Sequence, residues 1–136
     1  MTLVSHPLDP ITPGEIQSAA LIVRNGYPQE QIRFKLIDIF DCPKEEVKKY
    51  LEKKRLGQGA NELPDRRARV YFHLKSDLYL LHKAVVNITA SRVDKDEALK
   101  DVQGSVDFEE WSEVEEACNT HPKVLEQVKR LGLPQG

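Results

Sequence analysis

Cysteine, long apolar stretches and charge of one sign are all scarce in this chain of 136 residues, and each absence excludes a class of protein. The two cysteines, Cys42 and Cys118, lie far apart and form no Cys-X-X-Cys pair, so we expect free thiols and no disulfide framework. No apolar run approaches the ~18 residues of a membrane-spanning helix, which argues against a membrane protein. The 20 basic and 22 acidic residues give a net charge of -2, which favours neither nucleic acid nor an anionic membrane as a partner.

The pattern of a secretory signal is also missing from the start of the sequence. Met1 to His6 shows no basic stretch followed by an apolar run, which is the pattern of a secretory signal. The triplet Asn87-Ile88-Thr89 matches a glycosylation site, but such a site is used in secreted proteins. We therefore expect a cytoplasmic protein without a glycan. Its 40% apolar and 31% charged residues are typical of a soluble globular domain with one core.

Capping and breaking residues divide the chain into helices and strands. Thr12 followed by Pro13 and Glu15 is a combination that begins a helix. Residues 31–40 are rich in β-forming side chains, which indicates a strand. The same reasoning predicts helices at 13–24, 43–55 and 108–118 and from 122 onward, and strands at 31–40, 66–75, 78–89 and 91–95. This order predicts an α+β fold, in which an antiparallel sheet packs on a helix.

The two central strands predict a β-hairpin with Ser76-Asp77 as a two-residue turn. This turn places Tyr71 opposite His82 and puts His73 on the same face of the sheet. We expect the opposite, more apolar face to pack on the first helix; it carries Val70, Phe72, Leu74, Tyr79 and Leu81. In the first strand, we expect Ile32, Phe34 and Leu36 to share one face.

Several segments, in their order and spacing, resemble the N-terminal region of copper amine oxidases. The opening His6-Pro7-Leu8-Asp9-Pro10-Ile11-Thr12, followed by Glu15-Ile16 and an alanine-rich helix, is similar to the start of that family. The resemblance continues almost to the end of the chain, through Ile32-Arg33-Phe34, Pro43-Lys44, Arg66-Arg67-Ala68, Ala84-Val85-Val86-Asn87-Ile88-Thr89, Val106-Asp107-Phe108-Glu109-Glu110 and His121-Pro122-Lys123-Val124.

The resemblance implies a cystatin-like fold, in which a curved antiparallel sheet cradles a helix. Residues 1–103 resemble the first N-terminal domain of these oxidases, called N2. Residues 104–136 resemble the start of the second, called N3, and we expect this helical segment to pack on the same domain. The family's topaquinone, copper ligands and catalytic aspartate belong to a later domain, so no catalytic residue is carried over to this chain. We therefore expect no amine oxidase activity from it.

The histidines and tyrosines support the same expectation without reference to a family. Copper requires clustered imidazoles, whereas His6, His73, His82 and His121 form no His-X-His or His-X-X-X-His pair. No tyrosine lies in the Asn-Tyr-Asp/Glu context of topaquinone. We expect neither a metal nor another cofactor. Metal analysis of the purified chain should show no stoichiometric copper, and one copper per chain would contradict this expectation.

A different chemistry could use the hairpin. Tyr71, His73 and His82 are the candidate catalytic residues, because histidine titrates near neutrality and tyrosine can donate to a developing oxyanion. On the floor of a bowl, such a set could support proton transfer, cyclisation or dehydration of a small molecule. The alternative is that the three side chains form an ordinary polar face. A change of one residue in the turn would separate them and weaken the catalytic hypothesis.

Two functions from different classes therefore stay open. The first is a non-catalytic module that binds a small ligand, another protein or itself, with a homodimer covering apolar surface around Leu78, Leu80 and the last helices. The second is a small cofactor-independent enzyme of a biosynthetic pathway, which would act as a cyclase, isomerase or dehydratase. Neither hypothesis involves nucleic acid or a membrane.

Overall fold

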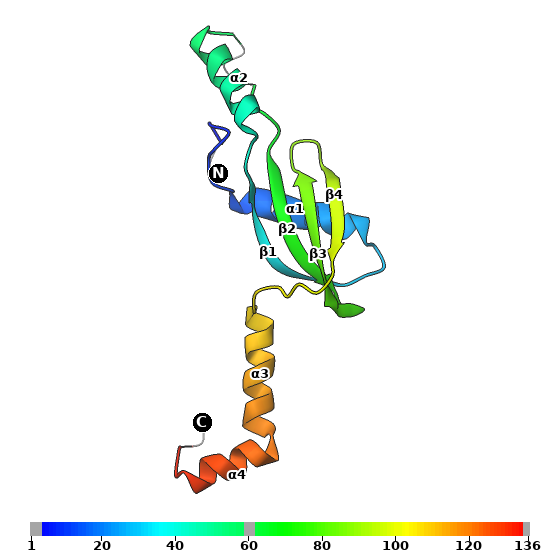
Figure 1. Cartoon of the computed structure of the whole chain (residues 1–136), viewed down its shortest axis with the longest axis vertical. Coiled ribbons are helices and arrows are strands. Elements are labelled where there is room, and N and C mark those ends of the chain that lie inside the picture. Colours follow the sequence, from blue (N-terminus) through cyan, green and yellow to red (C-terminus); the bar gives the residue numbers. More distant parts are fainter. Residues whose placement is uncertain (1–3, 59–61, 135–136) are drawn as a thin grey trace. The chain divides into compact units, whose positions relative to one another are not determined.

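The computed structural model describes residues 4–58 and 62–134, which divide between two compact units, residues 1–104 and 105–136 (Figure 1). All predicted helices and strands are present, and the largest difference is that the last strand extends to Leu99. The first unit contains α1 (Pro13–Gly26), β1 (Ile32–Phe40), α2 (Lys44–Arg55), β2 (Arg67–Leu74), β3 (Asp77–Asn87) and β4 (Arg92–Leu99). The second unit contains α3 (Phe108–Thr120) and α4 (Pro122–Arg130).

Helix α1 begins where the sequence predicts, at a complete capping box. The Glu15 amide donates to Thr12 Oγ1 at 3.3 Å, and the Thr12 amide donates to Glu15 Oε2 at 2.8 Å. These two bonds satisfy backbone donors that the first turn of a helix leaves free. The inner face of α1 buries Ala19 and Val23.

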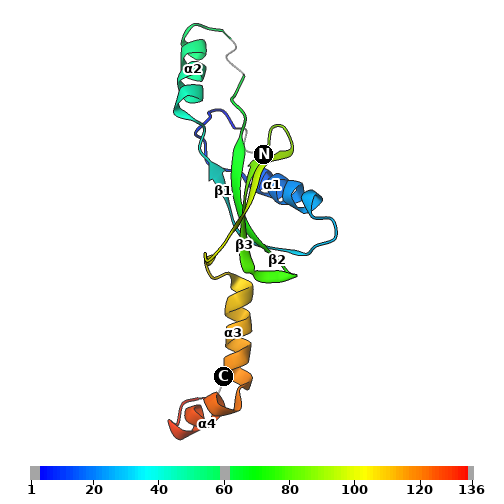
Figure 2. The ribbon, with the colours of Figure 1, turned by 45° about the vertical axis from the view of Figure 1, so that its right-hand side comes forward.

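The four strands form one antiparallel sheet in the order β1-β2-β3-β4, and α1 crosses one face of it (Figures 1 and 2). The sheet is twisted, and it curves around the helix in Figure 2. This arrangement confirms the predicted α+β fold and agrees with a cystatin-like architecture. The core lies between the helix and the sheet and consists of Ala19, Val23, Ala68, Val70, Phe72, Ala84 and Val86.

A β-bulge in β1 changes the predicted faces of that strand. Phe34 lies opposite Phe72, but Leu36 lies opposite Tyr71, so Lys35 is an extra residue. The alternation therefore reverses after Phe34. Leu36 points away from the core and is 47% exposed, whereas Ile37 packs against the core. The prediction that Leu36 shares the face of Ile32 and Phe34 was wrong.

The β2–β3 hairpin also differs from the prediction by one residue. Its turn is Lys75-Ser76, and Leu74 lies opposite Asp77. A bulge then follows in β3, after which His73 lies opposite Leu81 and Phe72 opposite His82. Because side chains alternate with a period of two, this slip moves residues of β3 to the other face of the sheet.

The triplet Asn87-Ile88-Thr89 has a structural role in the fold. Asn87 is fully buried, and its Nδ2 donates to Asp65 Oδ2 at 2.8 Å. Its Oδ1 accepts a hydrogen bond from the Ala90 amide at 2.8 Å. The Thr89 hydroxyl accepts a hydrogen bond from the Arg66 amide at 2.9 Å. The side chain that would carry a glycan is therefore enclosed and occupied.

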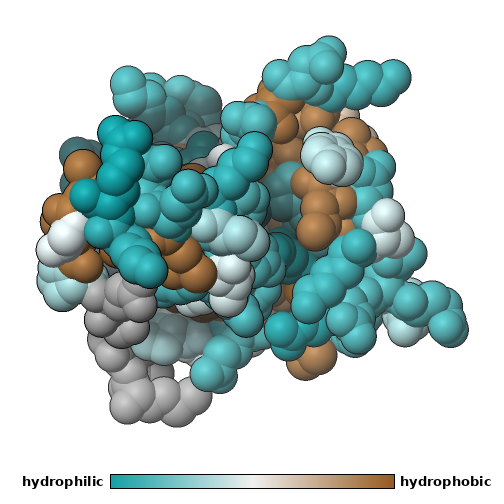
Figure 3. Space-filling view, turned by 90° about the horizontal axis from the view of Figure 1, so that it is seen from below, coloured by the Kyte–Doolittle hydropathy of each residue, from teal (hydrophilic) through white to brown (hydrophobic). Residues whose placement is uncertain are grey.

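The second unit consists of two helices with little core of their own. Helix α3 starts at a capping box in which the Glu110 amide donates to Asp107 Oδ1 at 2.9 Å. No residue of α3 or α4 is buried. Apolar side chains reach the surface between hydrophilic ones in the space-filling view (Figure 3). Within residues 4–58 and 62–134, no helix is long and apolar enough to cross a membrane.

Candidate functional site

The three predicted catalytic side chains do not share one face of the sheet. Tyr71 and His73 lie on the outer face, away from α1, because Val70 and Phe72 on the same strand point into the core. His82 lies opposite Phe72 and therefore faces α1. The expected Tyr71–His82 pair is wrong, since Tyr71 lies opposite Lys83. A catalytic role for these residues stays a prediction, without the geometry on which it was based.

His73 is held in a buried position on the outer face. It is 6% exposed, and its Nδ1 donates to the Leu80 carbonyl at 2.8 Å. A Cβ atom added to Gly104 would lie 3.6 Å from His73 Nε2 and 3.3 Å from Lys35 Cγ, so the backbone of Gly104 passes closely over the ring. The ring therefore fills space between the sheet and the end of the first unit.

His82 instead belongs to a polar group on the inner face that the sequence did not indicate. Its ring stacks on Phe72, with 5.1 Å between centroids, and its Nδ1 lies 3.6 Å from Asp96 Oδ1. The Tyr27 hydroxyl donates a short hydrogen bond to Asp96 Oδ2. The Tyr27 ring also meets both Phe72 and His82 edge-on. Tyr27, His82 and Asp96 thus join the end of α1 to β3 and β4.

The surroundings of Tyr27 disfavour its phenolate form. Partial burial, followed by the hydrogen bond to Asp96 and the negative charge of that carboxylate, raises the pKa of Tyr27 to about 12. At neutral pH the hydroxyl is therefore protonated and acts as a donor. Because the Tyr27 hydroxyl already donates to Asp96, this pair has a structural role: it holds the end of α1 against β4. Tyr27 and Asp96 are distant in sequence, and only the packing of α1 on the sheet brings them together.

A second polar group surrounds Arg66 at the opposite end of α1. Its Nε donates to Glu15 Oε1 at 2.8 Å and its Nη2 to Glu15 Oε2 at 3.0 Å. The guanidinium also donates to the carbonyls of Pro7, Asp9 and Pro10 at 3.2, 2.7 and 3.2 Å. Hydrogen bonds from Arg66, aided by those from Thr12, hold the pKa of Glu15 below its usual value. Arg66 thus fastens the proline-rich opening of the chain to the sheet.

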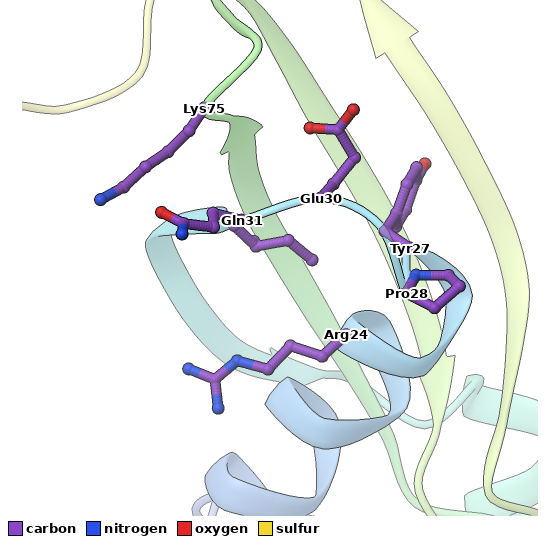
Figure 4. A pocket seen from close by; sticks show the side chains of 7 residues that line it. Arg24, Tyr27, Pro28, Glu30, Gln31 and Lys75 are labelled. Atoms are coloured by element: carbon purple, nitrogen blue, oxygen red, sulfur yellow. The ribbon is translucent and has the colours of Figure 1, made fainter.

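A depression of about 370 Å³ lies next to Tyr27, beyond the end of α1 (Figure 4). The side chains of Arg24, Gln31 and Lys75 extend toward the same side of it in Figure 4, whereas Glu30 and Tyr27 point elsewhere. The Arg24 guanidinium lies 5.2 Å from the centre of the Phe34 ring. The full lining consists of Arg24, Tyr27, Pro28, Glu30, Gln31, Ile32 and Lys75. Sequence reasoning missed this site because its residues come from a helix end, a loop and a hairpin turn.

The histidines also stay apart in the structure. His73 and His82 lie on opposite faces of the sheet, and the His6 ring meets the Tyr50 ring edge-on, 5.8 Å between centroids. His121 lies in the second unit, at the start of α4. Among residues 4–58 and 62–134, no group of three or more histidine, cysteine, aspartate or glutamate side chains is arranged to hold a metal ion.

Comparison with known proteins relates the fold to one family. The family model described as "Copper amine oxidase, N2 domain" matches residues 6–99. Over 129 residues the chain is 28% identical to a copper amine oxidase-like protein of Schizosaccharomyces pombe, and the aligned region covers 95% of this chain and 16% of that protein. Over 132 residues it is 29% identical to the primary amine oxidase of Arthrobacter sp. (strain P1), and the aligned region covers 96% of this chain and 18% of the relative.

A solved structure supports the same relation. The copper-containing benzylamine oxidase from Hansenula polymorpha superposes with a TM-score of 0.79 at 32% identity, over 95% of this chain and 20% of that one. The chain thus spans between 16% and 20% of the length of these three relatives. That the second unit corresponds to the start of an N3 domain stays a prediction.

Proposed function

Because this chain belongs to the copper amine oxidase N2-domain family, we propose that it is a non-catalytic recognition module, which pairs with a second copy of itself and does not oxidise amines. The family match is to the N2 domain, and the chain spans at most a fifth of the oxidases that it resembles. We therefore look for the function of these 136 residues in a binding surface and not in a catalytic site.

The observation that carries this proposal is the apolar stripe of α3. Phe108, Trp111 and Val114 are 91%, 67% and 61% exposed. Their spacing of three residues places them on one side of the helix. Two short helices without a buried residue cannot be stabilised by their own core. A partner that covered this stripe would supply the missing apolar contacts.

Charge favours α2 of a second copy as that partner. Helix α3 carries five glutamates and no basic residue, whereas α2 carries six basic and three acidic residues. Next to its charges α2 exposes Leu51 at 47%, and Leu56, which follows the helix, is 65% exposed. The two helices are thus complementary in charge, and each offers apolar side chains. Reciprocal contacts of α3 with α2 would close a twofold dimer.

Sedimentation velocity of the chain over a range of concentrations tests the proposal. We expect a monomer–dimer equilibrium that Trp111→Glu weakens by about 2 kcal/mol, roughly 30-fold, as loss of a central aromatic contact does. Trp111 is the only tryptophan of the chain, so its emission should shift to shorter wavelength as the dimer forms.

The matched control is Thr120→Glu, which adds the same charge on the opposite side of α3. Thr120 is exposed, and its hydroxyl donates to the carbonyls of Glu116 and Ala117 in its own helix at 2.8 and 3.5 Å. This variant should dimerise almost as well as the unmodified chain. A chain that stays monomeric at the highest concentration, or equal weakening by both variants, would overturn the proposal.

The alternative hypothesis of a cofactor-independent enzyme has lost its geometric basis. Tyr71 and His73 lie on one face of the sheet and His82 on the other. His73 is enclosed and already bonded to Leu80. No observation of the site favours catalysis over binding, so we propose binding alone.

A further inference from the structure

We propose that the depression beyond the end of α1 binds an oxyanion, a carboxylate or phosphate group, between Arg24, Gln31 and Lys75. This site is separate from α3 and does not depend on self-association. Its volume of about 370 Å³ lies in the range of small-ligand sites. In Figure 4, the Arg24 guanidinium, the Gln31 amide and the Lys75 ammonium extend toward the same side.

Contacts with neighbouring segments position both cations at the depression. The Lys75 amide donates to the Gln31 carbonyl at 2.8 Å, which ties the β2–β3 turn to the loop that follows α1. Arg24 in the last turn of α1 rests on the Phe34 ring, 5.2 Å from its centre. These contacts leave the N–H donors at the ends of the Arg24 and Lys75 side chains available for a ligand. A guanidinium and an ammonium together provide the charge-assisted hydrogen bonds that oxyanions prefer.

The neighbouring carboxylate does not neutralise these cations. Glu30 also lines the depression, but its Oε2 accepts a hydrogen bond from Ser76 Oγ at 2.8 Å, and its carboxylate points away from Arg24 in Figure 4. Among the residues that the structure describes, neither Arg24 nor Lys75 forms an ion pair with a carboxylate. The charge of the lining is therefore positive on the side where the donors point.

The rest of the lining selects the ligand further. Pro28, Ile32 and Tyr27 are also among the lining residues, so the depression has an apolar part besides its donors. A ligand with an anionic head and a small apolar or aromatic body fits such a lining, and an aromatic carboxylate is the simplest example. The same chemistry is offered by a free metabolite and by an acidic side chain of a protein, so the probes must distinguish these sources.

The test is a set of ¹H–¹⁵N NMR titrations of the full chain at constant ionic strength. The probes are benzoate, inorganic phosphate and a short glutamate-rich peptide. We expect saturable shifts of the amides of Gln31 and Lys75 and of the Arg24 side chain in the millimolar range. The double variant Arg24→Gln/Lys75→Gln should weaken binding by at least about tenfold, as loss of two charge-assisted bonds requires. The affinity of the single variant Lys75→Gln should lie between those of the unmodified chain and the double variant.

Lys54→Gln is the matched control. Lys54 is also an exposed cation over an aromatic ring, 5.7 Å from the centre of Tyr50, but it lies outside the depression. This variant should bind each probe as the unmodified chain does. Saturation by benzoate or phosphate identifies a small-molecule site, and saturation by the peptide alone identifies a protein ligand. No saturation with any probe, or equal loss in Lys54→Gln, would overturn the proposal.

Discussion

Arg66 shows how much of this fold depends on one side chain. It forms two hydrogen bonds with Glu15 and three with backbone carbonyls of the opening segment. The Arg66 and Glu15 side chains are only 8% and 13% exposed. Buried polar groups of this kind cost little while all partners are present, but much when one is removed. This group of hydrogen bonds, which we call the Arg66 clamp, therefore ties the proline-rich opening to the residue that directly precedes β2.

Arg66→Met should lower the free energy of unfolding by about 3 kcal/mol, because it leaves the Glu15 carboxylate enclosed without its cation. Urea denaturation followed by circular dichroism measures this loss. The control is Arg69→Met, since Arg69 pairs with Asp38 at 3.4 Å with side chains 38% and 46% exposed. Such an exposed pair contributes about 0–1 kcal/mol. Equal losses in the two variants would show that the clamp adds nothing.

The same pair has a predictable dependence on acid. Arg66 holds the pKa of Glu15 below its ordinary value of 4.5. A depressed pKa stabilises the fold above the unfolded value, and this contribution disappears as the pH falls through the folded value. The difference between the unmodified chain and Arg66→Met should therefore be largest above about pH 5 and should shrink in more acidic solution.

Tyr27 predicts the opposite dependence, in alkaline solution. Its pKa of about 12 in the folded chain exceeds the ordinary value of 10.0. The resulting stabilisation is complete below pH 10.0 and is lost as the pH rises toward 12. Tyr27→Phe should remove this part of the alkaline loss, as measured by denaturation across that range. Tyr79→Phe is the control, because Tyr79 is 98% exposed. An unchanged alkaline profile in Tyr27→Phe would contradict the assignment.

At the scale of elements, two helices with equivalent N-terminal capping boxes differ in what they contribute. Helix α1 supplies Ala19 and Val23 to the core, whereas α3 supplies no buried residue. Their caps, Thr12 and Asp107, accept the same kind of hydrogen bond from the third residue of the helix. Packing, and not the cap, therefore decides whether loss of a helix would unfold the sheet.

Thr12→Ala should lower the global stability by about 1 kcal/mol, the usual cost of a lost N-cap. Asp107→Ala should release α3 locally and leave the unfolding of the sheet unchanged. Urea denaturation monitors the first effect, and amide exchange in residues 108–114 monitors the second. A global loss in Asp107→Ala would show that α3 contributes to the core of the first unit.

At the scale of the whole molecule, the two units should differ in protection. The central strands enclose Val70, Phe72, Ala84 and Val86, all at 0% exposure. We expect their amides to exchange by global unfolding, and those of α3 and α4 to exchange by local opening. Hydrogen–deuterium exchange in dilute solution measures this contrast. Strong protection of α3 at the lowest concentration would contradict it. Protection that grows with concentration would accompany the proposed dimer.

Local patterns in the sequence were enough to predict the elements and the fold class. Caps such as Thr12 and Asp107 act on their own helix, and the apolar periodicity of 13–24 and 31–40 depends on residues close in the chain. The resemblance to the N-terminal region of copper amine oxidases was likewise carried by short segments, and the family match confirmed it. All of these signals are contained in the sequence itself.

Only the tertiary structure decided the sites. The bulges at Lys35 and in β3 depend on how strands pair, and a slip of one residue moved His82 to the face opposite His73. The Tyr27–Asp96 and Arg66–Glu15 pairs, like the depression at Arg24 and Lys75, join segments distant in the chain. Such contacts follow from the packing of α1 on a curved sheet, which no local pattern specifies.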